Sequence, residues 1–169
     1  MKFTFVPEYI FNNFSEASAD FLESIGVRGV ILDIDNTLEP YENDLPGEAV
    51  IAWLNSLSEK GIKCAFVSNN GKERVELFNK DLNLPAYYKA GKPFKKKLLL
   101  AMKDMGTDKE NTIAMGDQVF TDVWAAHNAG IRAILVPPIN DKKDILTKFK
   151  RWLERPVIKK YHKKRGKAN

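Results

Sequence analysis

Short apolar segments alternate with helical patterns through the middle of this chain of 169 residues. Three of the helical patterns end at Gly61, Gly106 and Gly130, which are common helix stop signals, and the remaining one ends before Pro85. The predicted strands cover residues 29–32, 63–67, 86–88, 112–115 and 131–136, and the predicted helices cover 48–60, 72–82, 94–105 and a segment ending near 130. Such alternation with short loops is typical of a parallel sheet with helices on both faces. We therefore predict an α/β fold, a three-layer Rossmann-like core with a parallel sheet of about five strands.

Four of the predicted strands are followed closely by polar residues that can carry chemistry. In chain order these residues are Asp33, Asp35, Ser68, Lys92, Asp117 and Asp122. In parallel sheets of this kind, ligands bind outside the carboxyl ends of the strands. We therefore expect these side chains to converge at one edge of the sheet.

The pair Asp33 and Asp35 stands at the end of the first apolar strand. Neighbouring carboxylates repel, so the pair costs stability unless a cation or a proton lies between them. Each motif alone also has an ordinary structural explanation: a strand-end acid can be a cap, residues 68–71 are typical of a turn, Lys92 fits a solvated lysine and Asp122 fits a helix N-cap. Their occurrence together favours a catalytic site.

The motifs resemble those of the haloacid dehalogenase (HAD) superfamily of phosphotransferases. In chain order, the segments that carry the resemblance are Asp33-Ile34-Asp35-Asn36-Thr37, Ser68, Lys92-Pro93 and Gly116-Asp117 followed by Thr121-Asp122. The chain is most similar to the subfamily IIIA (YqeG-type) phosphatases, which resemble the mitochondrial phosphatidylglycerophosphate phosphatase. The further segments that point to this branch are Asn69-Asn70, Ala90-Gly91, Gln118-Val119-Phe120 and Arg151-Trp152-Leu153-Glu154.

A divalent cation is expected at the acidic residues. A phosphate monoester dianion repels a carboxylate nucleophile, so a cation must neutralise charge where the two meet. Mg²⁺ takes oxygen ligands and is usually held by one or two carboxylates. We expect Asp33 and Asp117 to supply these carboxylates, and the resemblance implies the backbone carbonyl of Asp35 as a further ligand.

The catalytic roles follow from charge and position. Asp33 is the expected nucleophile, which forms an aspartyl-phosphate and so divides one difficult displacement into two easier ones. Asp35 is expected to protonate the leaving oxygen and then to deprotonate the attacking water. Lys92 supplies a fixed positive charge beside the phosphoryl group, and Thr37 is expected to brace the turn that holds the two acids.

Phosphate binding is expected from the loops after the strands. The hydroxyl of Ser68 can donate to a phosphoryl oxygen, aided by backbone N–H groups near Asn36 and Asn69 and by the charge of Lys92. Asp122 is expected to orient Lys92 or a metal-bound water without binding the metal itself.

Cysteine, histidine and hydropathy patterns exclude several other classes. Cys64 is the single cysteine, so the chain has no internal disulfide framework, and its apolar strand predicts a small buried side chain. His127 and His162 are too few and too separated for a zinc site. Residues 1–7 lack the long apolar core of a signal peptide, and no stretch is long enough for a membrane span. We expect a cytoplasmic protein, with peripheral binding at the inner membrane surface left open.

Basic residues are concentrated at the C-terminus. Residues 142–169 contain 12 Lys and Arg against 2 Asp and Glu, a net charge of +10, so residues 1–141 carry −5 of the chain's +5. Residues 144–153 have a helical pattern. We predict a single domain over residues 1–156 and a basic, flexible tail over 157–169. The tail is either a solvated appendage or a segment that attracts anionic lipid or nucleic-acid phosphates.

The predicted site has no room for a cap domain. Residues 39–47 and 89–91 are the only material at the two places where HAD-type phosphatases for small metabolites commonly insert one. An uncapped site admits a bulky substrate or needs a second subunit to cover it, so an oligomer is left open. The apolar N-terminal segment, residues 1–26, is expected to pack on the domain.

We therefore predict a Mg²⁺-dependent phosphomonoesterase. Phosphatidylglycerophosphate is the leading substrate, a choice based on the resemblance, the open site and the basic tail. The first alternative is a phosphatase for a soluble metabolite such as phosphoglycolate, a nucleotide or a sugar phosphate. A second, of another class, is a non-catalytic protein that binds RNA or the ribosome through the tail, but the intact Asp33, Asp35 and Lys92 argue against it.

Overall fold

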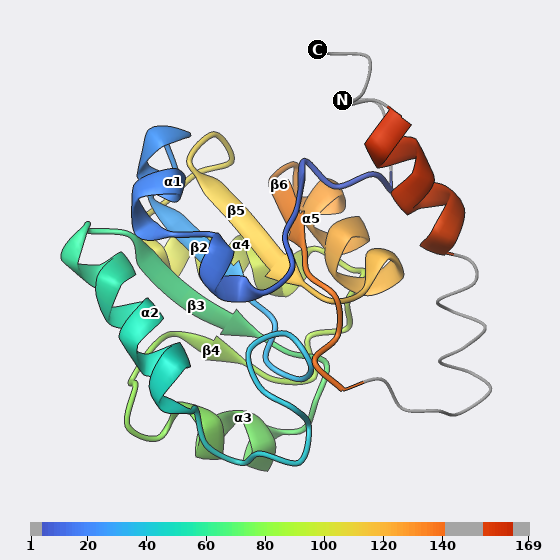
Figure 1. Cartoon of the computed structure of the whole chain (residues 1–169). Coiled ribbons are helices and arrows are strands. Elements are labelled where there is room, and N and C mark those ends of the chain that lie inside the picture. Colours follow the sequence, from blue (N-terminus) through green and yellow to red (C-terminus); the bar gives the residue numbers. More distant parts are fainter. Residues whose placement is uncertain (1–4, 141–153, 164–169) are drawn as a thin grey trace.

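A six-stranded parallel sheet forms the centre of the computed structural model, which describes residues 5–140 and 154–163 (Figure 1). The strands are β1 (Tyr9–Ile10), β2 (Gly29–Leu32), β3 (Lys63–Val67), β4 (Ala86–Tyr87), β5 (Thr112–Gly116) and β6 (Arg132–Leu135). Their order across the sheet is β1-β6-β5-β2-β3-β4, and every pairing is parallel. The predicted strands are confirmed. The additional strand β1 was not predicted because two residues are too short to show a strand pattern.

Helices cover both faces of this sheet. They are η1 (Phe14–Glu16), α1 (Ala19–Ser24), α2 (Glu48–Glu59), α3 (Lys72–Asn79), α4 (Lys96–Met105), the π-helix η2 (Val119–Val123) and α5 (Trp124–Ala129). Side chains alternate across each strand, so Val30 and Leu32 of β2 pack with α1, α2 and α3, whereas Ile31 packs with α4, η2 and α5. The predicted three-layer α/β architecture is therefore confirmed.

Two helices differ in length from their sequence predictions. Helix α3 ends at Asn79 instead of residue 82, because the Asn79 side chain bonds the backbone N–H and carbonyl of Leu84 and so closes a turn. Helix α4 begins at Lys96 instead of residue 94. The helix predicted over residues 144–153 lies outside the described residues.

The N-terminal segment packs on the domain. Phe14 makes an edge contact with Trp53 of α2, and the Trp53 indole N–H donates to the carbonyl of Ala17 at 2.9 Å. Tyr9, Phe11 and Phe21 form a further aromatic group against the same side of the core. The N-terminal segment therefore extends the hydrophobic core beside α2.

Residues 154–163 form a helix (red in Figure 1), whereas the sequence predicts a flexible tail from residue 157. Val157 and Ile158 pack with the hydrophobic cluster around α4 and α5. Glu154 and Tyr161 are buried, and the Tyr161 hydroxyl accepts a hydrogen bond from Ile10 N–H at 3.1 Å. These four residues have the i, i+3, i+4, i+7 spacing of one helix face, a pattern hidden in the sequence by the surrounding lysines.

Within residues 5–140 and 154–163, no helix combines the length and apolarity needed to cross a bilayer. The same residues contain no cap domain, because short loops occupy positions 39–47 and 89–91. The carboxyl ends of the two central strands, β2 and β5, therefore lie uncapped at one edge of the sheet.

Candidate active site

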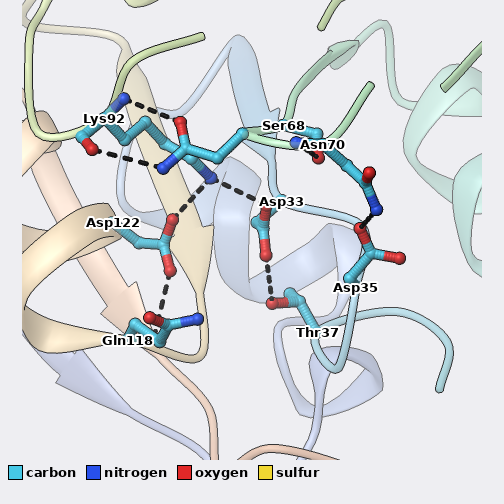
Figure 2. A network of polar contacts seen from close by, with 9 residues as sticks. Asp33, Asp35, Thr37, Ser68, Asn70, Lys92, Gln118 and Asp122 are labelled. Carbon is cyan, nitrogen blue, oxygen red and sulfur yellow. Dashed lines mark hydrogen bonds and ion pairs between the residues drawn. The ribbon is translucent and has the colours of Figure 1, made fainter. Parts of the chain in front are cut away.

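Lys92 lies at the centre of a buried group of acids (Figure 2). Its ammonium nitrogen is 2.7 Å from Asp33 Oδ1 and 2.6 Å from Asp122 Oδ1, and its side chain is only 6% exposed. Asp33 extends from β2, Asp122 lies in η2, and Lys92 comes from the loop before α4. Three separate segments thus bring opposite charges together at the carboxyl ends of the central strands.

The burial of this group changes its ionisation. Burial, together with the negative charges of Asp122 and Asp35, raises the pKa of Asp33 to about 6, although the positive charge of Lys92 acts to lower it. Burial lowers the pKa of Lys92, but the charges of Asp122 and Asp33 outweigh it and raise the pKa above its ordinary value. Lys92 therefore stays protonated at all physiological pH values.

Asp117 completes an acidic cluster with Asp33 and Asp122. All three residues are buried, and one carboxylate oxygen from each lies within 4.8 Å of the others. Three buried carboxylates against the single charge of Lys92 leave an excess of negative charge that favours binding of a cation. An all-oxygen donor set suits a hard divalent ion. The residues present therefore fit the metal site expected from the sequence, with Asp122 closer to it than expected.

Gly116 allows Asp122 to reach this position. A Cβ atom at residue 116 would lie 2.3 Å from Asp122 Cγ, a distance that no packing tolerates. The second oxygen of Asp122 accepts a hydrogen bond from Gln118 N–H at 3.0 Å. The next N–H along, that of Val119, donates to Glu154 Oε1 at 3.0 Å, so the helix of residues 154–163 also holds this loop.

Thr37 contacts the proposed nucleophile. Its hydroxyl donates to Asp33 Oδ2 at 3.2 Å, and the residue is almost completely buried. Asn36 has a φ of 61°, which turns the chain sharply directly after Asp35, and its N–H donates to the carbonyl of Glu39 at 2.7 Å. The Asn36 N–H, expected near the phosphate, is therefore used inside the turn.

Ser68 and Asn69 directly follow β3 and make different contacts. Ser68 is buried, and its hydroxyl oxygen accepts a hydrogen bond from Asn70 N–H at 3.1 Å. The Asn69 side chain bonds the backbone of Lys92 twice, accepting from its N–H at 2.7 Å and donating to its carbonyl at 3.2 Å. The Asn69 side chain thus joins the loop after β3 to the loop that carries Lys92.

Asp35 points away from the acidic cluster. Its Oδ2 accepts a hydrogen bond from Asn70 Nδ2 at 3.0 Å, and its Oδ1 accepts one from Arg74 Nε at 3.0 Å (Figure 2 shows the Asn70 contact). The sequence pattern does not single out Arg74, because a basic residue in a charged helix is ordinarily solvated. The available signal was its place in the first turn of the helix that follows the Ser68 segment, since that turn begins at the edge of the sheet where the site lies.

Two sequence comparisons agree with this arrangement. The haloacid dehalogenase-like hydrolase family matches residues 42–136. A relative in Bacillus subtilis (strain 168), named probable phosphatase YqeG, is 35% identical over 158 residues, which are 94% of this chain and 92% of the relative. Both comparisons indicate the same kind of protein as the motifs do.

Solved structures share the fold at low sequence identity. The cobalt-bound deoxy-D-mannose-octulosonate 8-phosphate phosphatase YrbI from Haemophilus influenzae has a TM-score of 0.54 and 17% identity, covering 69% of this chain and 81% of that one. CbbY from Rhodobacter sphaeroides in complex with phosphate has a TM-score of 0.54 and 12% identity, covering 70% and 89%. An uncharacterized protein from Listeria monocytogenes serotype 4b has a TM-score of 0.55 and 18% identity, covering 70% and 85%.

Proposed function

This chain belongs to the haloacid dehalogenase-like hydrolases and is a phosphatase, and from that premise we propose that it hydrolyses phosphate monoesters through an aspartyl-phosphate on Asp33. The observation that carries the proposal is the buried cluster in which Lys92 pairs with Asp33 and Asp122, with Asp117 alongside. A buried cation among several carboxylates is a costly arrangement, which a catalytic site for a phosphate dianion would explain.

In the first step, an oxygen of Asp33 attacks phosphorus and the bond from phosphorus to the leaving oxygen breaks. Since the pKa of Asp33 is about 6, it is mostly a carboxylate at neutral pH and can attack. Asp35 gives a proton to the leaving oxygen. In the second step, Asp35 takes a proton from water, the water oxygen attacks phosphorus, and inorganic phosphate leaves a restored Asp33.

The remaining residues bind and orient the phosphoryl group. Lys92 faces its oxygens with a positive charge that Asp122 holds in place, and Ser68 offers a hydroxyl. Asp33 and Asp117, with the backbone carbonyl of Asp35, would hold Mg²⁺. When bound, the ion neutralises charge between the nucleophile and the phosphate.

We propose phosphatidylglycerophosphate as the leading substrate. The motif resemblance suggests it, and two structural observations support a large anionic substrate at a membrane surface. The site has no cap among the described residues. The helix of residues 154–163 is docked on the domain with Arg155, Lys159, Lys160 and Lys163 exposed, a basic surface suited to anionic lipid. A cytoplasmic protein that associates peripherally with the membrane would fit this role.

Phosphate release from a panel of substrates tests the proposal. The panel comprises phosphatidylglycerophosphate in anionic vesicles, phosphoglycolate, a nucleotide and a sugar phosphate, each with Mg²⁺ and with EDTA. We expect activity only with Mg²⁺ and the highest kcat/KM on the lipid. A soluble metabolite preferred by tenfold or more would favour the alternative substrate class, and activity undiminished by EDTA would contradict the metal site.

A surface variant tests the role of the basic helix without unfolding it. Replacing Lys159, Lys160 and Lys163 by Gln leaves Val157, Ile158 and Tyr161 in place. We expect weaker vesicle binding and lipid turnover, and less sensitivity to salt, with unchanged turnover of a water-soluble phosphate. Lipid turnover equal to that of the wild type would contradict a lipid-binding role.

A further inference from the structure

Arg74 of α3 reaches the side chain proposed as the acid and base. Its Nε lies 3.0 Å from Asp35 Oδ1, and the two side chains are 10% and 17% exposed. Asn70 donates to the other oxygen, Asp35 Oδ2, at 3.0 Å. Both oxygens of Asp35 are therefore held by donors from the segment that follows β3.

Arg74 is itself fixed by its surroundings. A second guanidinium nitrogen, Nη1, donates to the carbonyl of Asp44 at 2.9 Å, which joins it to the loop of residues 39–47. The guanidinium lies 5.3 Å from the ring centroid of Phe78, a completely buried residue one turn further along α3. Its third nitrogen, Nη2, is buried without a hydrogen-bond partner in residues 5–140 and 154–163.

Comparison with a neighbouring lysine, Lys72, shows that Arg74 is not an ordinary surface charge. Lys72 begins the same helix, is 60% exposed, and faces Glu76 at 3.6 Å across one helical turn. Exposed pairs of that kind contribute little to stability or specificity. Arg74 is instead buried against the site, and its rigid planar group can fix the direction of a carboxylate as a lysine cannot.

We propose that Arg74 is a positioning residue for catalysis, which holds Asp35 where its carboxylate exchanges a proton with the leaving oxygen. The inference rests on the proposed role of Asp35. An acid or base acts only within hydrogen-bond reach of the proton that it transfers. Arg74 and Asn70 together restrict the rotation of the Asp35 side chain, and the Asp44 contact ties this orientation to the loop beside the site.

The leaving group provides the test. The departing p-nitrophenolate needs little protonation, whereas an alkoxide from an alkyl phosphate such as glycerol 3-phosphate needs a proton. The ratio kcat/KM reports only the steps up to departure of the leaving group, so slow hydrolysis of the intermediate does not obscure the comparison. Arg74→Gln should lower kcat/KM about tenfold or more for the alkyl phosphate, a fraction of the 10²–10⁴ that a general acid contributes, and less than about threefold for p-nitrophenyl phosphate.

Companion variants separate positioning from packing. Arg74→Lys keeps the positive charge but loses the planar guanidinium that bonds both Asp35 and Asp44. Its kcat/KM for the alkyl phosphate should lie between those of the wild type and Arg74→Gln. Lys72→Gln, the matched loss of charge on the same helix, should leave kcat/KM unchanged for both substrates. In an Asp35→Asn background, Arg74→Gln should add less than about a twofold loss, because residues that act as a unit are not additive. Thermal melts of each variant report whether it is folded.

Three outcomes would overturn the inference. An equal loss on both substrates, or an undiminished effect of Arg74→Gln in the Asp35→Asn background, would show that Arg74 acts only through packing. Wild-type values for both Arg74 variants, with Asp35→Asn impaired on the alkyl phosphate, would refute the inference while leaving the proposed function intact. Normal activity of Asp35→Asn on the alkyl phosphate would remove the premise shared by both.

Discussion

The two regions of concentrated charge in this protein are held in opposite ways. At the acidic cluster, Lys92 is buried and lies within 2.7 Å of two carboxylates. On the helix of residues 154–163, Lys159 and Lys160 are exposed, and apolar and polar contacts of the opposite face attach the helix. A buried charge depends on each of its partners, whereas an exposed charge acts at long range and is screened by salt. The first region is suited to chemistry and the second to association.

The largest expected effect is the loss of turnover in Asp33→Asn. An amide cannot serve as the nucleophile, so turnover should fall at least about 10³-fold while the fold is preserved. The measurement is phosphate release with Mg²⁺, with circular dichroism and a thermal melt as controls of folding. Near-normal turnover by the folded variant would exclude the proposed covalent mechanism.

The second prediction compares one lysine from each region. Lys92→Ala leaves Asp33 and Asp122 buried without their cation, and breaking a buried pair in this way costs about 3–5 kcal/mol. Lys160→Ala removes an exposed lysine and should change the free energy of unfolding by less than about 0.5 kcal/mol. Urea denaturation in EDTA measures both. Equal effects would mean that the Lys92 contacts do not hold the cluster together.

The residues that could be predicted from the sequence are those that local patterns place at strand ends. Asp33, Lys92 and Asp117 follow apolar strands, and the edge where they meet is set by a local pattern and the rules of parallel sheets. Arg74 does not directly follow a strand, and its contact could not be predicted because its partner Asp35 is 39 positions away and the two meet only in the folded chain.

The C-terminal helix was missed for a related reason. The charge of residues 157–169 and their position after Pro156 favour a solvated tail, while the attachment of the helix of residues 154–163 depends on a distant partner, Ile10. The strand β1 owes its existence to pairing with β6 rather than to its two residues. Patterns within a segment predicted the architecture and most of the site, but contacts between distant segments could not be read from them.

The third prediction concerns pH in the absence of metal. The pKa of Asp33 is about 6 in the folded protein, above its ordinary value of 3.8. The folded state therefore binds this proton more tightly than the unfolded chain, so stability is lost as the pH rises from about 4 to about 6. Asp33→Asn avoids this loss and should be more stable than the wild type at pH 7 in EDTA, with the difference shrinking toward pH 4. Urea denaturation of both proteins between pH 4 and pH 7 measures this. A difference in the free energy of unfolding that stayed constant across the range would contradict the prediction.

The smallest expected effect concerns the attachment of the C-terminal helix. Tyr161→Phe keeps the buried ring but removes the oxygen that accepts the hydrogen bond from Ile10 N–H. A hydrogen bond of this kind contributes about 0.5–1.5 kcal/mol, so the free energy of unfolding should fall by about 1 kcal/mol and hydrogen exchange at Ile10 should accelerate. Turnover of a soluble phosphate should stay within about twofold of the wild type, because Glu154 still accepts from Val119 N–H. A much larger loss of turnover would show that Tyr161 supports the loop of Asp117 and Asp122. The attachment of the C-terminal helix and the activity of the acidic cluster would then be coupled.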